Sequence, residues 1–118
     1  MILENTIRNA SQILKKHNIV SHELDAQIIF SNIMGVTRDF LILNNNVNIS
    51  EKTIKKYNEA IKRRIKREPI AYITGKKEFW SQDFVVNYST LIPRPETELL
   101  IYKVIDFFKY KRINILDI

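Results

Sequence analysis

Residues 92–98 read Ile-Pro-Arg-Pro-Glu-Thr-Glu, and this stretch organises the C-terminal part of the chain. Its two prolines fix φ at alternate positions and keep the residue before each of them out of the helical region. The backbone is therefore expected to be extended and stiff until a helix begins, over about 96–109, with two glutamates of the stretch at its positive end. The apolar run Ile113–Ile118 then predicts a buried parallel strand, as at the start of a doubly wound α/β sheet.

An aromatic segment precedes this stretch. Residues 69–75 read Pro-Ile-Ala-Tyr-Ile-Thr-Gly, and residues 78–80 read Glu-Phe-Trp. The change of hydrophobic period at residue 70 predicts a strand over Ile70–Thr74, a turn over Gly75–Lys77 and a returning strand over Glu78–Trp80. A β-hairpin is therefore expected between the two halves of the chain.

The first 68 residues predict a compact unit of four helices. Ser21 and Ser50 are predicted N-caps, Gly35 is a predicted left-handed helix end, and Glu68-Pro69 is expected to end the last helix. Apolar residues recur at helical spacing in three stripes: Leu3, Ile7, Ala10 and Leu14; Leu24, Ile28, Ile29 and Ile33; and Ile54, Tyr57, Ile61 and Ile65.

The order of these segments resembles one family, the N5-glutamine methyltransferases that modify peptide chain release factors. That family carries a small N-terminal helical domain, an Arg-x-Pro-Ile-Ala-Tyr-Ile-x-Gly segment, a Glu-Phe-Trp hairpin and a Leu-Ile-Pro-Arg-Pro-Glu-Thr-Glu run. In this sequence the three motifs stand at Arg67–Gly75, Glu78–Trp80 and Leu91–Glu98.

The resemblance implies a mainly α chain with three parts. Residues 1–68 would be an N-terminal helical bundle that recognises the substrate, 69–90 a β-hairpin linker, and 91–118 the incomplete start of a Rossmann-like methyltransferase domain. Family members continue from a strand that ends Ile-Leu-Asp, here Ile115–Asp117, into a glycine-rich loop that holds S-adenosylmethionine. With only two glycines in this sequence, we expect the chain to be truncated before that loop, to carry no catalytic residue and to bind no cofactor by itself.

Three residues of the proline stretch are candidates for cofactor binding. In the resembling family this segment lies beside the methionine end of S-adenosylmethionine, where Arg94 could meet a carboxylate and Glu96 and Thr97 stand next to it. The alternative is a helix start with capping acids and an arginine that stabilises a domain junction. No metal site is expected, because His17 and His22 stand alone near a helix boundary without a carboxylate cluster.

The positive charge is confined to one segment. Residues 52–77 hold ten Lys or Arg and two Asp or Glu, a net charge of +8, whereas 1–51 and 78–118 each carry −1. Such a local field can steer a partner into contact, so the candidate partner-binding residues are Lys55, Lys62, Arg63 and Lys66. The alternative is a solvated helix face, because helix surfaces commonly carry charge opposite an apolar stripe.

The resemblance implies a full-length enzyme that transfers a methyl group from S-adenosylmethionine to the glutamine of the release factors' Gly-Gly-Gln motif. The expected partners are the release factors, with the ribosome as a further candidate. The main alternative is a non-enzymatic helical module that binds RNA or a protein through its basic helix, and a methyltransferase for another protein or a nucleic-acid amine is a third. Nucleic acid is not the expected partner. Abundant Ile, Asn and Lys indicate an AT-rich coding sequence, which raises the number of lysines without any function, so the positive charge is weak evidence for nucleic-acid binding.

The sequence also carries expectations about location. It has no cysteine, which fits a reducing compartment. Its apolar runs are too short to cross a bilayer, and its N-terminal residues lack the apolar core of a secretory signal. We therefore expect a cytoplasmic protein without a membrane partner.

Overall fold

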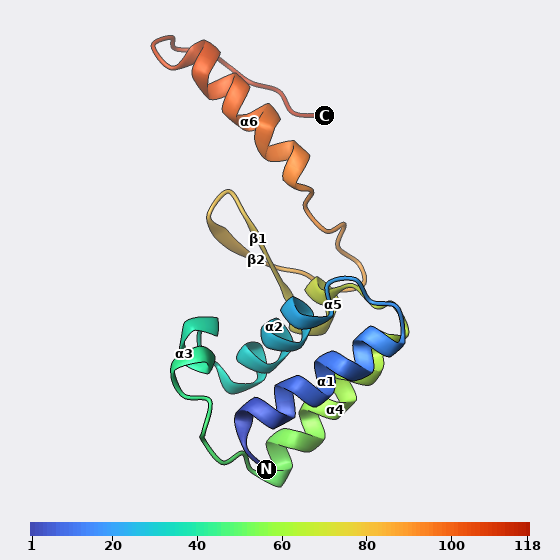
Figure 1. Cartoon of the computed structure of the whole chain (residues 1–118). Coiled ribbons are helices and arrows are strands. Elements are labelled where there is room, and N and C mark those ends of the chain that lie inside the picture. The colour runs from blue at the N-terminus through green and yellow to red at the C-terminus, as the bar shows by residue number, and fades with distance from the viewer. The chain divides into compact units, whose positions relative to one another are not determined.

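The computed structural model describes all residues, 1–118, and is mainly helical (Figure 1). The chain divides after Gly75 into two compact units, each of which is described by itself. Unit 1 holds α1 (Leu3–Lys16), α2 (His22–Met34), α3 (Arg38–Leu43), α4 (Glu51–Ile65) and α5 (Ile70–Thr74); unit 2 holds β1 (Lys76–Phe79), β2 (Gln82–Val85) and α6 (Pro95–Phe108).

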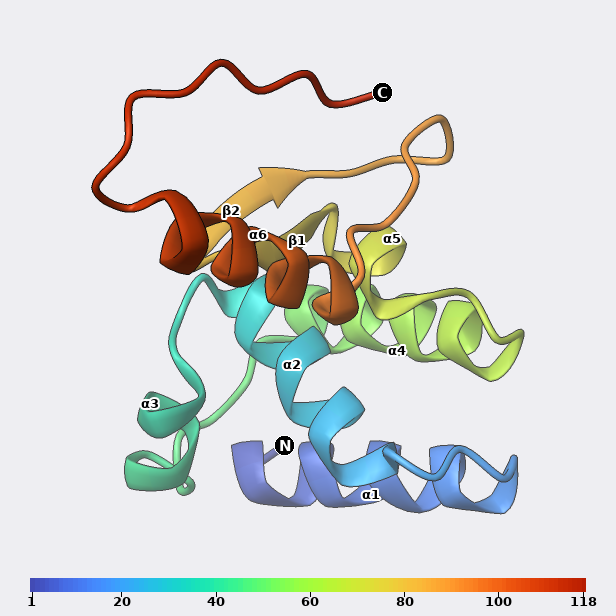
Figure 2. The ribbon, with the colours of Figure 1, turned by 90° about the horizontal axis from the view of Figure 1, so that it is seen from above.

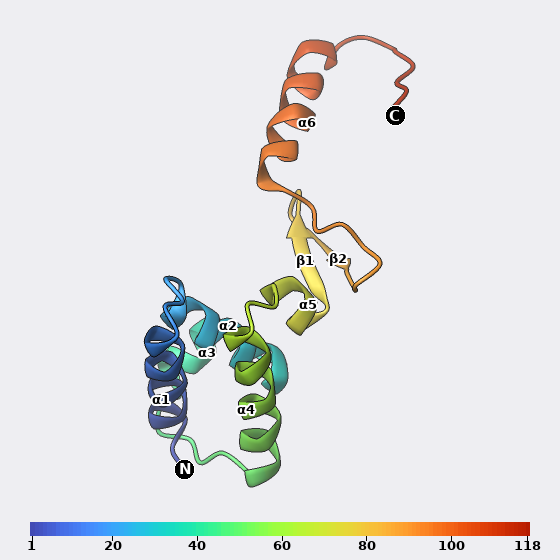
Figure 3. The ribbon, with the colours of Figure 1, turned by 90° about the vertical axis from the view of Figure 1, so that its right-hand side faces the viewer.

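Unit 1 is a helical bundle with a single core. Helix α2 packs against α1 and α4, and α1 and α4 lie side by side (Figures 1 and 3). The predicted stripes of α1 and α4 supply Leu3, Leu14 and Tyr57 to this core. The stripe predicted for α2 is only partly right, because Ile29 is buried but Leu24 is 42% exposed, and Phe30 fills the core instead. The segments that precede α1 and α4 also meet, in an antiparallel bridge between Ile2 and Asn48. The four predicted helices of 1–68 are therefore confirmed.

The helix ends of unit 1 follow the local chemistry. Gly35 ends α2 in the left-handed conformation, with φ 66°, and Ser50 Oγ accepts a hydrogen bond from the Thr53 amide at 3.2 Å. Ser21 behaves differently, because its hydroxyl donates to the Asp25 carboxylate at 3.0 Å and caps no backbone amide. None of the helices has the length and apolar composition needed to cross a bilayer.

The strand predicted over Ile70–Thr74 is wrong, because this segment forms the short helix α5. The Pro69 carbonyl accepts hydrogen bonds from the Tyr72 and Ile73 amides, and Gly75 closes the turn with φ 75°. Helical spacing lets Ile70 and Ile73 pack together against the core of unit 1. Burial of this face outweighs the β propensity of the isoleucines.

The hairpin therefore lies later in the chain than predicted. Strands β1 and β2 pair antiparallel, with Lys76 opposite Val85 and Phe79 opposite Gln82. Glu78 and Phe79, predicted in the returning strand, belong to the first strand β1. Trp80 and Ser81 form the two-residue turn, and the returning strand is β2. The rings of Phe79 and Phe84 pack edge to face with centroids 6.1 Å apart.

The strand predicted over Ile113–Ile118 is not formed. Helix α6 appears much as predicted, but the residues after it have no regular secondary structure, and Ile115 and Leu116 are 68% and 82% exposed. A parallel strand needs neighbours on both sides for its backbone hydrogen bonds and both faces covered, and no strand of the structure pairs with this segment.

Candidate functional sites

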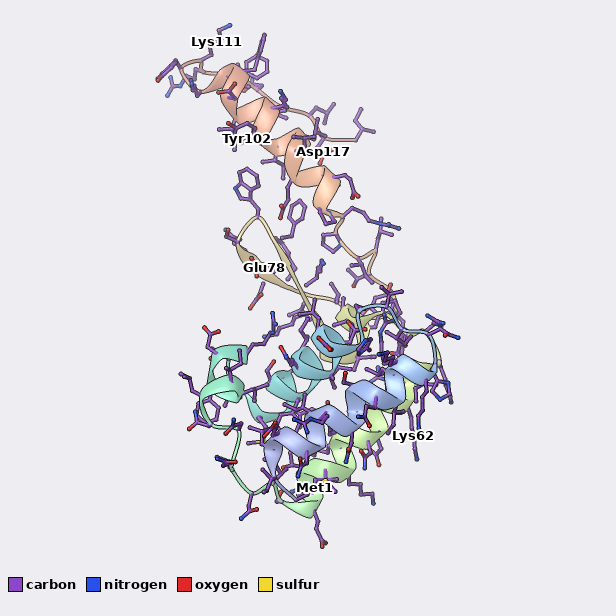
Figure 4. All side chains as sticks on the ribbon, viewed as in Figure 1. Met1, Lys62, Glu78, Tyr102, Lys111 and Asp117 are labelled. Atoms are coloured by element: carbon purple, nitrogen blue, oxygen red, sulfur yellow. The ribbon has the colours of Figure 1, made fainter.

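The basic helix α4 carries its charge on the face opposite its core residues. Tyr57, Ala60 and Ile61 are buried, whereas Lys55, Lys62 and Lys66 are exposed. Figure 4 shows Lys62 directed away from the bundle. These three lysines have no ion pair in the structure, so their ammonium groups are available to solvent or to a partner.

The arginines at the end of α4 have a different role. Arg63 donates to both carboxylate oxygens of Glu68, with an Nε–Oε2 distance of 2.8 Å, and its side chain is 42% exposed. Its guanidinium also reaches the carbonyl of Tyr72 in α5 at 3.4 Å. Arg63 is therefore engaged inside unit 1, where it joins the end of α4 to α5, unlike the lysines with which it was grouped.

Arg64 and Arg67 extend this internal network. Arg64 Nε donates to Asp25 in α2 at 2.7 Å, and its Nη1 donates to the Glu68 carbonyl at 3.0 Å. Arg67 donates to the carbonyls of His17 and Asn18, which follow the last turn of α1, at 3.1 and 3.3 Å. The arginines of this segment thus tie α4 to α1, α2 and α5, and the lysines carry the exposed positive field.

The proline stretch presents its candidate residues to solvent. Arg94 is the extended residue before α6, with φ −97° and ψ 139°, and Pro95 is the first helical residue. The side chains of Arg94, Glu96 and Thr97 are all exposed, and none of them has an ion pair or a side-chain hydrogen bond in the structure. A guanidinium, a carboxylate and a hydroxyl thus lie close together in sequence at the positive end of α6.

The two histidines are not part of a cluster of metal ligands. Nδ1 of His22 lies 2.8 Å from the hydroxyl of Ser11, which joins α1 to α2. No group of three His, Cys, Asp or Glu side chains lies close enough together to hold a metal ion.

Sequence reasoning did not find one feature, a groove of about 340 Å³ on unit 1. Apolar side chains from α1 and α3 line it, including Ile7 and Ile42, and the exposed Glu4–Arg8 ion pair lies along its wall. None of the three predicted apolar stripes includes residues of α3, so no pattern placed them beside α1.

Comparison with known proteins decides the family. A model of the PrmC N-terminal domain matches residues 5–75, which is more than half of the chain and all of the bundle from α1 to α5 except the first two residues of α1. The chain belongs to this family. The resemblance inferred from the motifs at 67–75, 78–80 and 91–98 is thereby confirmed.

Curated relatives of this PrmC-family chain match it beyond the helical domain. A release factor glutamine methyltransferase of Buchnera aphidicola (subsp. Schizaphis graminum) is 44% identical over 94 residues, covering 80% of this chain and 34% of that protein. The release factor glutamine methyltransferase of Clostridium acetobutylicum is 37% identical over 116 residues, covering 96% and 41%. A bifunctional methyltransferase of Rickettsia typhi is 40% identical over 103 residues, covering 87% and 20%. The chain thus spans well under half of the length of these relatives.

Proposed function

We propose that this chain is the N-terminal portion of a release factor N5-glutamine methyltransferase. The full-length enzyme would transfer a methyl group from S-adenosylmethionine to the glutamine of the Gly-Gly-Gln motif. In this proposal residues 1–68 recognise the release factor, 69–90 set the angle between domains, and 91–118 begin a Rossmann-like methyltransferase domain. The observation that carries the proposal is the family match over 5–75, followed by the intact motif at 92–98.

Partner recognition is assigned to the exposed lysines of α4. Lys55, Lys62 and Lys66 lie on one exposed helix face, and no acidic group of the chain neutralises them through an ion pair. Long exposed ammonium groups accelerate the encounter with an acidic surface more than they strengthen the final complex. The proposed partner surface of the release factor is therefore acidic. Arg63, the fourth candidate, would contribute less to this surface, because its guanidinium is already held by Glu68.

The proline stretch is assigned to the methionine end of S-adenosylmethionine. That end carries a carboxylate and an ammonium group, and the donors and acceptors at the start of α6 fit both. Arg94 would donate to the carboxylate. Glu96 and Thr97 supply acceptor oxygens beside it, all three side chains being exposed. When bound, the cofactor supplies the methyl group, and the residues of this chain would only bind and orient it.

A chimeric enzyme tests the proposal. Residues 1–118 would replace the matching N-terminal segment of the Buchnera aphidicola relative, and mass spectrometry would measure methylation of the Gly-Gly-Gln glutamine of a release factor. We expect methylation of that glutamine alone. A folded chimera that methylates a nucleic acid or another protein, and no release factor, would overturn the proposal. Tighter binding of the chain to RNA than to any release factor would favour the helical RNA-binding alternative.

A further inference from the structure

The turn at the tip of the hairpin has an unusual composition. Trp80 and Ser81 have φ values of 52° and 57°, so both central residues lie in the left-handed region. Two-residue hairpin turns of this kind strongly prefer Asn-Gly, Asp-Gly or Gly-Gly, because a side chain disfavours positive φ. Strained backbone of this kind persists where surrounding contacts hold it in place.

The contact that holds this turn comes from helix α6. Oε1 of Glu98 accepts a hydrogen bond from the Trp80 amide at 2.7 Å. Glu98 is half-buried, whereas its neighbours Glu96 and Thr97 are exposed. Figure 3 shows the start of α6 beside the tip of the hairpin, and Figure 2 shows the same elements from above. A carboxylate acceptor makes this bond stronger than one between neutral groups.

The bond also closes a loop. It joins residues 18 positions apart, and the segment between them contains β2, the proline stretch and Arg94. The same segment has two further anchors. Val86 is buried, and a tight turn runs from Asn87 to Thr90, whose amide donates to the Asn87 carbonyl at 2.9 Å. Arg94 lies between that turn and α6, and Glu98 holds the start of α6 to the hairpin.

We propose that Glu98 is a positioning residue, which closes the loop 81–97 on the Trp80 amide and thereby holds Arg94 for the carboxylate of S-adenosylmethionine. The cofactor part of this inference rests on the function proposed above. Glu98 itself touches no reacting group in this account. Its effect passes through the Trp80 amide to the backbone that carries Arg94.

A set of three variants of the 118-residue chain separates this role from simple charge at a helix start. Glu98→Ala removes the acceptor, and Glu98→Gln keeps an acceptor oxygen but removes the charge. Asp83→Ala removes the same charge from an exposed position on β2 whose side chain forms no ion pair. Circular dichroism would confirm that each variant keeps its helices.

Amide hydrogen exchange and ¹⁵N relaxation measure the loop directly. In Glu98→Ala we expect the Trp80 amide to exchange roughly fivefold to tenfold faster, as for loss of one charge-assisted hydrogen bond. Residues 91–94 should also become more mobile. Glu98→Gln should recover most of the protection, and Asp83→Ala should match the parent. Unchanged Trp80 exchange and unchanged mobility at 91–94 in Glu98→Ala would overturn the inference.

The chimeric enzyme then tests the consequence for the cofactor. Glu98→Ala should raise KM for S-adenosylmethionine severalfold with a much smaller change in kcat, and Glu98→Gln should restore KM. An unchanged KM in a chimera whose Trp80 amide has lost its protection would overturn the link to the cofactor. If the parent chimera is folded but methylates no release factor, the proposed function fails, and the exchange data still decide whether Glu98 closes the loop.

Discussion

Nε of Arg64 lies 2.7 Å from Oδ2 of Asp25, and this ion pair joins the end of α4 to the first turn of α2. The two side chains are only 18% and 5% exposed, and the hydroxyl of Ser21 donates to the same carboxylate oxygen. The basic segment 52–77, which suggested a partner surface, therefore also contains residues that hold the helices of the bundle together. The arginines at the end of α4 are thus paired inside the bundle, whereas Lys55, Lys62 and Lys66 have no ion pair.

Asp25→Ala should destabilise unit 1 strongly. It leaves the guanidinium of Arg64 without its carboxylate, and removing one partner of a buried pair costs about 3 kcal/mol. Urea unfolding followed by circular dichroism measures the effect. The matched control is Glu4→Ala, which breaks the exposed pair with Arg8 and should cost less than about 0.5 kcal/mol. Equal losses in the two variants would contradict a structural role for the buried pair.

Tyr57→Phe should cost less and should change the response to alkali. The Tyr57 hydroxyl donates to the Ala26 carbonyl at 2.9 Å, and loss of this hydrogen bond should cost about 1 kcal/mol at neutral pH. Burial raises the pKa of the Tyr57 phenol above its usual value, since the charged form is poorly solvated in the core.

The raised pKa of Tyr57 determines how the stability of unit 1 changes with pH. A raised folded-state pKa contributes stability that is complete below the unfolded pKa of about 10 and is lost as the pH rises toward the folded pKa. The parent should therefore lose stability above about pH 10 more steeply than Tyr57→Phe. Thermal unfolding at several alkaline pH values measures this, and parallel curves would show that Tyr57 does not contribute.

Amide exchange should separate the core of the bundle from the C-terminal segment. We expect the slowest protons in α1, α2 and α4, whose buried residues form one core. Ile115 and Leu116 are exposed and have no strand partner, so their amides should exchange at nearly the unprotected rate. Slow exchange at these two residues in a monomer would mean that the segment has found a structure not seen here.

The isolated 118-residue chain should bind S-adenosylmethionine only weakly. In our proposal Arg94 and its neighbours would contact one end of the cofactor, but the sequence holds only two glycines and no glycine-rich loop for the rest. Calorimetric titration should show no micromolar binding. A dissociation constant in the micromolar range would show that the proline stretch is a larger part of the cofactor site than we propose.

Periodicity predicted the bundle because its stripes are long and its caps are local. Ser50 caps a helix, Gly35 ends one, and the stripe through Tyr57 repeats at helical spacing. Each of these signals depends on residues only a few positions apart, so it can be recognised in the sequence alone. The errors fall where distant contacts decide. Ile70 and Ile73 favour a strand by propensity but form a helix because its face packs on the core. The Trp80-Ser81 turn contains no Gly or Asn from which it could be predicted, and it is held by a hydrogen bond to Glu98, which lies 18 residues later.

The candidate sites show the same limit. Composition identified the basic segment, but it could not separate Arg63, whose partner is Glu68, from the exposed lysines. Glu68 meets Arg63 because α4 ends at Ile65 and the chain turns back, and this geometry cannot be recognised from the residue types alone. The residues of the proline stretch could be proposed because a local motif carries them, and their role in cofactor binding stays a prediction.

Low-salt association kinetics with a release factor test the central claim most directly. Reversal of Lys55, Lys62 and Lys66 to Glu reverses three of the unpaired charges on the exposed face of α4. It leaves the core stripe intact, so helicity should be preserved. The matched control reverses Lys103, Lys111 and Arg112 in unit 2, which gives the same change in net charge. Stopped-flow measurements should show association slowed at least about tenfold in the α4 variant, with the effect fading as salt rises and dissociation nearly unchanged. An association rate equal to that of the parent, or slowed as much by the control, would contradict a role for α4 in recognising the release factor.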